Sequence, residues 1–329
     1  MLRNPIQKLN KLYYHWKRGY WMLDPRTYLG NYKNIPIDRP IFLLGVQCGG
    51  LTLVSRMLRR HPSVVSVTGN YRYWSGADEM HTVLGPILPS ELSGCRYKVP
   101  NSKHPLFSPP RSWTYACNEL LPYYRRTALD ANPELTKKFK RIIQIIIAKY
   151  AIDKHNARFT DKSQVYTVRV ALISELLREN NPKFILIVMN PYALCYKAAN
   201  GKAADIDRLK KKLSLEVRLN ICAQHWANSM KCALEDRKEN MLIIRFEDIL
   251  QDPITYMRKL CKFAELDFNE DMLPQPHHKI PLGSRFPDRW YPLEPERSQN
   301  YFQKIGRKEI EIVSKYCKNL ALQFGYHIP

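Results

Sequence analysis

Residues 41–58, IFLLGVQCGGLTLVSRML, decide the fold. The four apolar residues 41–44 predict a buried strand, and a glycine-rich turn follows them. The amphipathic stretch 52–60 predicts a helix, which ends before the His-Pro pair that follows it. A second β-branched strand is expected at 64–67. Strand, glycine turn, helix and strand in this order are typical of the opening of a parallel α/β unit.

The glycine-rich turn has the spacing of a nucleotide phosphate loop. Residues 45–52 read G-x-x-x-x-G-L-T, so Leu51 stands where such a loop carries its lysine. Backbone amides and a helix N-terminus still bind an anion without side-chain charge, whereas triphosphate chemistry also needs the lysine and a magnesium ion. The residues expected to bind the anion are Gln47, Cys48, Gly49, Gly50, Leu51 and Thr52.

The rest of the chain continues the α/β pattern. The run 184–189 is apolar throughout and predicts a strand buried on both faces, as in a parallel sheet. Further expected elements are a helix at 134–150, a polar turn and helix at 159–180, a helix at 213–234, a strand that runs into an acidic turn at 240–250, and a helical and irregular tail at 251–329. The predicted fold class is α/β: a P-loop-like parallel β-sheet flanked by helices, in a single domain over 41–329 without repeats or linkers.

Two segments interrupt or precede this pattern. Eight prolines and several aromatic residues fall within 85–133, which excludes long helices there and predicts an insertion that runs over the surface. It is either a lid that faces the substrate or an insertion without that role. Residues 1–40 are expected to form a basic, helical N-terminal extension.

The positive net charge of the chain indicates which classes of partner it attracts. The chain of 329 residues carries a net charge of +22, and so positive a field attracts anions. Nucleotide phosphates, acidic glycans and an anionic membrane surface are candidates, and a solvated basic surface is the alternative. No nucleic-acid-binding motif occurs, so the charge alone does not indicate nucleic acid. The eight cysteines have no zinc-ligand spacing and are interpreted as reduced and structural.

The N-terminus has no apolar signal-peptide core, and no run of 18 apolar residues occurs. A cytoplasmic location is expected. Residues 7–22 are basic and aromatic, so peripheral contact with an anionic membrane surface is one interpretation. A helix packed on the body of the domain is the other.

Three segments together resemble the sulfotransferase family that uses 3′-phosphoadenosine 5′-phosphosulfate (PAPS). They are the loop after the first strand, "KFILIVMNPYALCYKAA" at 183–199, and "MLIIRFEDILQDP" at 241–253. A fourth segment, "DRWYPLEPERSQNYFQKIG" at 288–306, is similar to the end of the family's domain. The resemblance covers roughly 40–75 and 159–329. It implies that Asn190 contributes to the donor site and that the acidic turn of Glu247 and Asp248 braces the fold.

Two cations of the family pattern are missing from this sequence. The loop arginine or lysine that contacts the transferred sulfonate corresponds to Cys48, and the arginine that contacts the 3′-phosphate corresponds to Met189. Lys197 stands where the family has a serine. We expect Lys197 to reach the 3′-phosphate; the alternative is a solvated helix lysine. Arg285 and Arg289 lie where the family places a basic loop over the same phosphate.

A further lysine is implied by "FTDKSQVY" at 159–166, which resembles the E-K-[ST]-P-x-Y turn of glycan sulfotransferases. The resemblance places Lys162 at their active-site lysine, where it would stabilise charge on the bridging oxygen as the sulfonate leaves. A turn lysine in water is the alternative interpretation.

Sulfonate transfer needs a base that takes the proton of the acceptor. The segment "GNYRYWSGADEMH" at 69–81 offers His81 and Glu79, ranked together, and then Asp78. Helical spacing would place Asp78 and His81 on one face. Arg72, Tyr73 and Trp74 are candidates for binding a sugar ring or a charged acceptor.

The predicted function is PAPS-dependent transfer of a sulfonate to a hydroxyl or amine of a glycan or small metabolite, without a metal ion. The alternative is a catalytically lapsed sulfotransferase fold that binds an anionic glycan. A nucleotide kinase fits the loop spacing but not Leu51.

Overall fold

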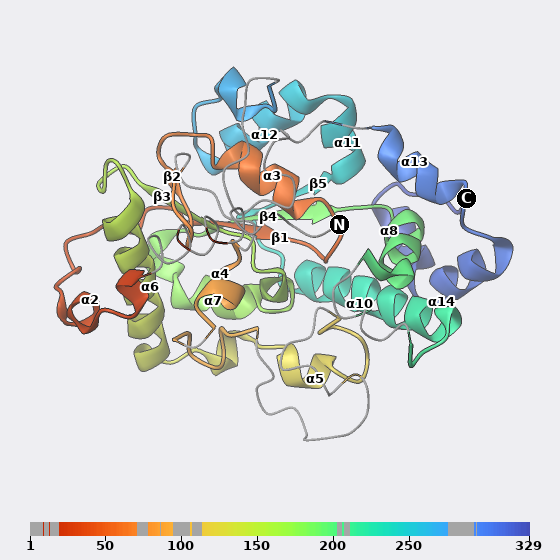
Figure 1. Ribbon diagram of the computed structural model, residues 1–329, viewed down its shortest axis with the longest axis horizontal. Helices are drawn as coiled ribbons and strands as arrows, with labels where there is room; N and C mark the ends of the chain where they lie inside the picture. Colours follow the sequence, from red (N-terminus) through yellow and green to blue (C-terminus); the bar gives the residue numbers. More distant parts are fainter. Residues whose placement is uncertain are drawn as a thin grey trace.

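The computed structural model describes residues 20–70, 78–85, 87–94, 114–202, 211–275 and 295–329, together with residues 9, 13, 106, 206 and 293. Its centre is a parallel sheet of five strands in the order β2-β3-β1-β4-β5 (Figure 1). The strands are β1 (Ile41–Leu44), β2 (Val64–Val65), β3 (Arg158–Asp161), β4 (Lys183–Val188) and β5 (Met241–Arg245). The predicted fold class, a single α/β domain with a P-loop-like parallel sheet, is therefore confirmed.

The helices follow the strands along the chain. The longer ones are α3 (Leu51–Leu58), α6 (Pro133–Tyr150), α7 (Val170–Leu176), α8 (Pro191–Lys197), α10 (Leu215–Glu235), α11 (Phe246–Gln251), α12 (Pro253–Ala264), α13 (Glu296–Phe302) and α14 (Arg307–Gln323). Shorter ones are α2 (Pro25–Leu29), α4 (Met80–Val83) and α5 (Leu121–Tyr124). Single turns lie at Tyr20–Met22, Ala128–Asp130, Gln164–Val168, Arg178–Asn180, Ala198–Lys202 and Glu270–Met272.

Strand β1 separates two apolar cores. Its alternate residues point to opposite faces of the sheet. Ile41 and Leu43 belong to the core under α3, α11 and α12, and Phe42 and Leu44 belong to the core under α6, α7, α10 and α14. Figure 1 shows these two groups of helices on opposite faces of the sheet. Burial on both faces explains why β1 and β4 read as continuous apolar runs.

The predicted turn at the start of 159–180 is wrong, because residues 158–161 form strand β3. This strand pairs in parallel with β1 through Thr160 and with β2 through Arg158. Its polar side chains hid it from an analysis of hydrophobic pattern. They are nevertheless satisfied inside the fold: the Arg158 guanidinium donates to the carbonyls of Arg39 and Ala264 at 2.8 and 2.7 Å.

The predicted surface course of 85–133 is wrong for its described part 114–124. Tyr115, Ala116 and Tyr124 are buried. The Ala116 amide donates to Nδ1 of His225 on α10 at 3.1 Å, and the Asn228 side chain donates to the Ala116 carbonyl at 2.8 Å. This segment is part of the core under α10. Of the N-terminal extension, Trp21 packs on α6, where its indole donates to the Tyr150 hydroxyl at 2.8 Å.

Other predicted features match the structure closely. Helix α6 covers the predicted 134–150, and β5 runs directly into the acidic first turn of α11. Asp252 caps α12 by accepting from the Thr255 amide at 3.1 Å. Among the described cysteines, all but the partly exposed Cys48 are buried, in agreement with small apolar side chains in the core.

The turn from β1 into α3 depends on one glycine that has no room for a side chain. Gly50, the N-cap of α3, has φ +89°, in the left-handed region that favours glycine. A Cβ atom on Gly50 would lie 2.2 Å from the ring of Phe246 at the start of α11. The close approach of α11 therefore requires glycine at this position.

We predict that Gly50→Ala lowers the free energy of unfolding by about 2 kcal/mol or more, from overpacking and from the positive φ together. Urea unfolding would measure this. Gly306→Ala is the matched control, because Gly306 has φ −87° and its Cβ would meet only the end of the Glu309 side chain. Equal effects of the two substitutions would contradict the packing argument.

Candidate active site

The candidate site lies at the carboxyl-terminal edge of the sheet. Strands β1, β3 and β4 are neighbours and parallel, so Gly45, Lys162 and Asn190, which follow their ends, meet at this edge. In open parallel sheets, ligands bind outside the carboxyl ends of the strands. The three segments that the sequence analysis selected are therefore brought together by the topology.

Thr167, which follows β3 in the chain, holds the first residue of the phosphate loop, residues 45–52. The Gly45 amide donates to Oγ1 of Thr167 at 2.8 Å, and that hydroxyl donates back to the Gly45 carbonyl at 3.0 Å. Cys48 has φ +70°, which turns the chain toward α3. At the helix start, the amides of residues 50–52 face outward as the first amides of a helix do. They provide the anion-binding end of α3.

The side chains of the loop differ in what they offer an anion. The Leu51 side chain is 2% exposed and packs in the core, so only its amide can bind. Gln47 and Thr52 are half-buried. Oε1 of Gln47 is buried and accepts no hydrogen bond within the described part of the chain. A Cβ on Gly49 would come within 2.9 Å of the Val46 carbonyl, so this turn also needs glycine.

Lys197 brings a cation to this loop. It is the last residue of α8, and its ammonium donates to the Cys48 carbonyl at 3.1 Å. The same ammonium lies 5.7 Å from the centre of the Tyr301 ring on α13. A solvated helix lysine is therefore the wrong interpretation. Lys197 stands beside the very loop residue that replaces the family's cation.

The end of β4 is rigidly braced. The Asn190 side chain caps α8, because its Oδ1 accepts from the Tyr192 backbone amide at 3.0 Å. The backbone amide of Asn190 donates to Oε1 of Glu247 at 3.0 Å. Oε2 of Glu247 accepts from the Tyr326 hydroxyl at 2.7 Å. The bracing role expected for Glu247 is borne out by these contacts. Met189 is buried and contributes no polar side chain.

A buried ion cluster lies beside the loop, after β3. The Lys162 ammonium is 2.8 Å from Asp78 and 2.5 Å from Glu79, and the Arg59 guanidinium is 3.1 Å from Asp78. The side chains of Lys162, Asp78 and Arg59 are at most 1% exposed, and that of Glu79 is 11% exposed. A turn lysine in water is therefore the wrong interpretation of Lys162, and two carboxylates balance its charge.

The charges in this cluster shift each other's pKa values. Burial opposes ionisation of Asp78, but the attraction of Lys162 and Arg59 outweighs it and holds the pKa of that carboxyl below its usual value. Burial also opposes the charged form of Lys162. The two neighbouring carboxylates prevail, and the pKa of the ammonium is raised. Asp78 and Lys162 are consequently both ionised at neutral pH.

Asp161 differs from its neighbour Asp78. It accepts from the amides of Met80 and Ser163 at 2.7 and 2.8 Å and so holds α4 and the turn after β3 together. Burial raises the pKa of Asp161 to about 6, against the opposing effect of these hydrogen bonds. His81 is held in the same way, because its amide donates to Oγ of Ser163 at 3.0 Å. The whole His81 residue is buried, with 3% of its surface exposed.

The sequence predicted Asp78 and His81 on one face of a helix, but the structure places these candidate bases differently. Asp78 and Glu79 precede α4 in extended backbone and both reach Lys162, whereas His81 lies in α4. Arg72, Tyr73, Trp74, Arg285 and Arg289 lie outside the described residues. Sequence reasoning missed Arg59, Asp161 and Thr167. Asp161 stood next to the quoted lysine, but nothing in the sequence pointed to Arg59 or Thr167 as partners.

We predict that Lys162→Ala lowers the free energy of unfolding by about 3–5 kcal/mol, because Glu79 loses its counter-charge and the buried Asp78 keeps only Arg59. Chemical denaturation at pH 7 would measure the loss. Lys138→Ala is the control: its ion pair with Glu134 is exposed on α6, and we expect less than about 1 kcal/mol. A loss for Lys162→Ala as small as for the control would contradict the buried cluster.

We predict that Asp161 makes the fold less stable as the pH rises from 4 to 6. Its pKa is about 6 in the fold and near 3.8 when unfolded, so the folded state binds the extra proton in this window. The stability contribution is complete below the unfolded pKa and is lost through the folded one, a change of about 3 kcal/mol. Unfolding of Asp161→Asn should lack this slope, and parallel pH profiles for the two proteins would refute the prediction.

Within the described residues, no group of three or more histidine, cysteine or acidic side chains is arranged to hold a metal ion. None of the described helices is long and apolar enough to cross a membrane.

Solved structures that are similar to this chain include two sulfotransferases. The sulfotransferase STF9 from Mycobacterium avium is 14% identical, with a TM-score of 0.50 over 99% of this chain and 87% of that one. The sulfotransferase domain of the Synechococcus PCC 7002 olefin synthase is 18% identical, with a TM-score of 0.49 over 91% and 99% of the two chains. At 14% identity, the similarity to STF9 concerns the fold alone. No curated protein matches the sequence.

The family assignment comes from the sequence itself. The model of the sulfotransferase family matches residues 40–270, which is well over half of the chain. The match includes the phosphate loop, the strand before Asn190 and the acidic turn after β5. The predicted resemblance is confirmed: this chain belongs to the sulfotransferase family.

Proposed function

We propose that the protein transfers a sulfonate from PAPS to a hydroxyl or amine of a glycan or small-metabolite acceptor. The observation that carries this proposal is the hydrogen bond from Lys197 to the Cys48 carbonyl. The loop has lost its own cation at position 48, and a lysine from α8 supplies one at the same place. A fold that no longer bound the donor would have no need of this replacement.

The residues of the loop fit a phosphate-bearing donor. The amides of residues 50–52 would hold the 5′-phosphate at the start of α3, and the side-chain NH2 group of Gln47 would donate to it from beside them. Glycines at 49 and 50 let the loop pack closely against the Val46 carbonyl and the Phe246 ring, which fixes the backbone that would hold the phosphate. PAPS, when bound, would supply the sulfonate through its phosphosulfate group.

We propose that Lys197 stabilises the negative charge that develops on the leaving group. As the sulfur–oxygen bond of the donor breaks, negative charge develops on the bridging oxygen, and a cation at the loop would stabilise it. The sequence analysis gave this role to Lys162. Because two carboxylates balance the charge of Lys162, we propose Lys197 in its place and regard Lys162 as a positioning residue for Glu79.

On the acceptor side we propose Glu79 as the base. It would take the proton of the acceptor as the new bond to sulfur forms. Its carboxylate is fixed by Lys162 and is the most exposed member of the ion cluster. His81 is the second candidate. Asp78 ranks last, because it is shared between Lys162 and Arg59 in full burial.

A cytoplasmic location, peripheral contact with an anionic membrane, and 3′-phosphate contacts from Arg285 and Arg289 are part of this proposal. The proposed transfer uses side-chain and backbone charges and no metal ion. A lapsed fold that binds an anionic glycan is the second candidate function, favoured by Cys48 and the buried Met189 in place of two family cations.

We predict micromolar binding of 3′-phosphoadenosine 5′-phosphate by calorimetry, and no comparable binding of ATP with magnesium. Lys197→Met keeps the length of the side chain but removes its charge. It should weaken bisphosphate binding about 10- to 100-fold, since hydrogen bonds to charged groups contribute about 1.5–3 kcal/mol. Lys137→Met, on an exposed position of α6, is the control for net charge.

The outcomes separate the candidate functions. Bisphosphate binding together with transfer of labelled sulfonate from PAPS to any member of a glycan and metabolite panel supports the enzyme. Binding without transfer favours the lapsed fold. No bisphosphate binding by the wild type would overturn the donor site, and equal weakening by the two lysine variants would overturn the assignment of Lys197.

A further inference from the structure

The edge of the sheet opposite β2 carries a groove that the donor site does not use. Strand β5 pairs only with β4 among the described strands. The Phe184 amide donates to the Asn240 carbonyl at 2.9 Å, so the peptide groups of alternate residues, 240, 242 and 244, face β4. The peptide groups of Ile243 and the amide of Arg245 therefore point to the open side of the strand.

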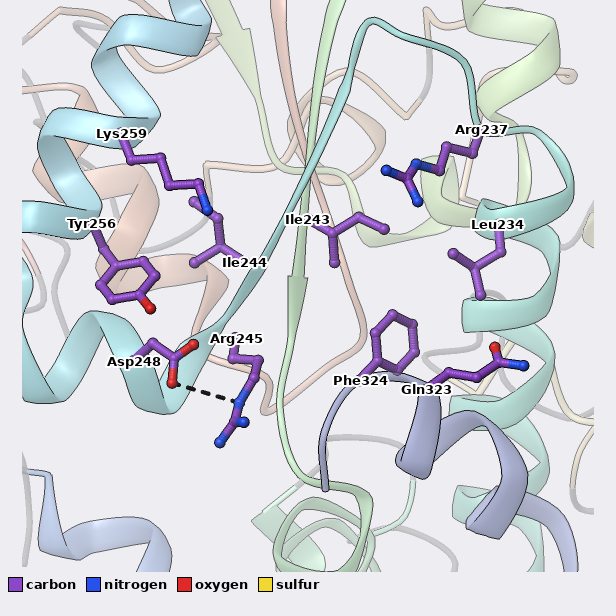
Figure 2. A pocket seen from close by; sticks show the side chains of 10 residues that line it. All are labelled: Leu234, Arg237, Ile243, Ile244, Arg245, Asp248, Tyr256, Lys259, Gln323 and Phe324. Atoms are coloured by element: carbon purple, nitrogen blue, oxygen red, sulfur yellow. Dashed lines mark ion pairs between the residues drawn. The ribbon is translucent and has the colours of Figure 1, made fainter. Parts of the chain in front are cut away.

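A cavity of about 400 Å³ lies along this open side (Figure 2). Its floor is formed by Ile243, Ile244 and Arg245 of β5. Figure 2 shows one wall from α11 and α12 and an opposite wall from the ends of α10 and α14. The wall residues are Asp248, Tyr256 and Lys259 on the first side and Leu234, Arg237, Gln323 and Phe324 on the second.

The two walls carry unbalanced positive charge. Arg237 and Lys259 are exposed, and neither forms an ion pair with any carboxylate in the described part of the chain. Arg245 is 3.5 Å from Asp248, which balances only that one cation. A ligand in this groove thus meets hydrogen-bonding peptide groups on the floor and one cation on each side.

We infer that this groove binds an acidic segment of a partner protein as an added strand. An extended peptide satisfies the outward peptide groups of an edge strand, and its side chains alternate between the two faces. Consecutive acidic residues would place one carboxylate near Lys259 and the next near Arg237. Ile243, Leu234 and Phe324 supply apolar contacts for an aliphatic side chain elsewhere in the segment.

Charge decides between this occupant and a second copy of the chain. Edge-to-edge pairing of two β5 strands would bring Arg237, Arg245 and Lys259 of both copies into one interface. Like charges juxtaposed in an interface are costly, whereas an acidic segment complements them. The inference does not depend on the donor or on the acceptor of the proposed sulfonate transfer.

The test uses the full chain and a fluorescent eight-residue peptide of valine, threonine and glutamate, with glutamates at both odd and even positions. Fluorescence anisotropy should give saturable binding with a Kd below about 1 mM. A peptide with lysine in place of glutamate tests the charge. A peptide interrupted by proline tests the backbone pairing, because proline cannot donate to a strand. Both should lose at least about tenfold in affinity.

Two protein variants test the site. The double variant Arg237→Glu with Lys259→Glu should weaken binding at least about tenfold. Its control, Lys137→Glu with Lys154→Glu, changes the net charge equally at exposed positions on and after α6. Ile243→Pro removes an outward amide without breaking the pairing with β4. It should weaken binding at least about tenfold while the bisphosphate affinity, which reports a folded domain, remains near wild type.

Each result bears on the inference. Loss in the groove variants with retention in the control supports it. It is overturned if the wild type does not bind the glutamate peptide, if the proline peptide binds equally, or if the control variant loses as much affinity as the groove variant. Dimerisation of the wild type in sedimentation experiments, abolished by Ile243→Pro, would instead assign the groove to a second copy.

Discussion

The parallel pairing of β1 with β3 and β4 is the constraint on which the candidate site depends. The loop after β1 precedes the turn after β3 and the start of α8 by more than a hundred residues, yet all three lie side by side because their strands run in the same direction in adjacent positions. The loop after β1, the turn after β3 and the start of α8 after β4 therefore share one edge. Loss of register at β1 would separate the loop from both lysines.

Two lysines at this edge have opposite surroundings, and the difference determines what each can do. Lys162 is fully buried and faces two carboxylates, so its charge is used within the fold. Lys197 is half-buried beside the Cys48 carbonyl and the Tyr301 ring. We propose that its positive charge, at the phosphate loop, acts on the anionic donor.

A series of contacts connects the groove at β5 to the edge of the sheet where the proposed donor site lies. The Arg245 guanidinium lies 4.6 Å from the centre of the Tyr326 ring, and the Tyr326 hydroxyl contacts Glu247 and the Val188 carbonyl. Glu247 in turn holds the Asn190 amide at the end of β4. The C-terminal residues after α14 therefore stabilise the strand end at which the proposed donor site begins.

The sequence by itself determined the α/β class, the position of the phosphate loop and most of the helices, because continuous apolar runs, glycine spacing and caps are local signals. The bracing role of Glu247 followed from the family resemblance. It could not reveal β3, whose polar residues find their partners only in the folded chain. It also could not place Lys197 at Cys48 or surround Lys162 with Asp78 and Glu79. These contacts join residues 83 to 149 positions apart. Only the tertiary structure, which fixes strand order and register, brings such charges together.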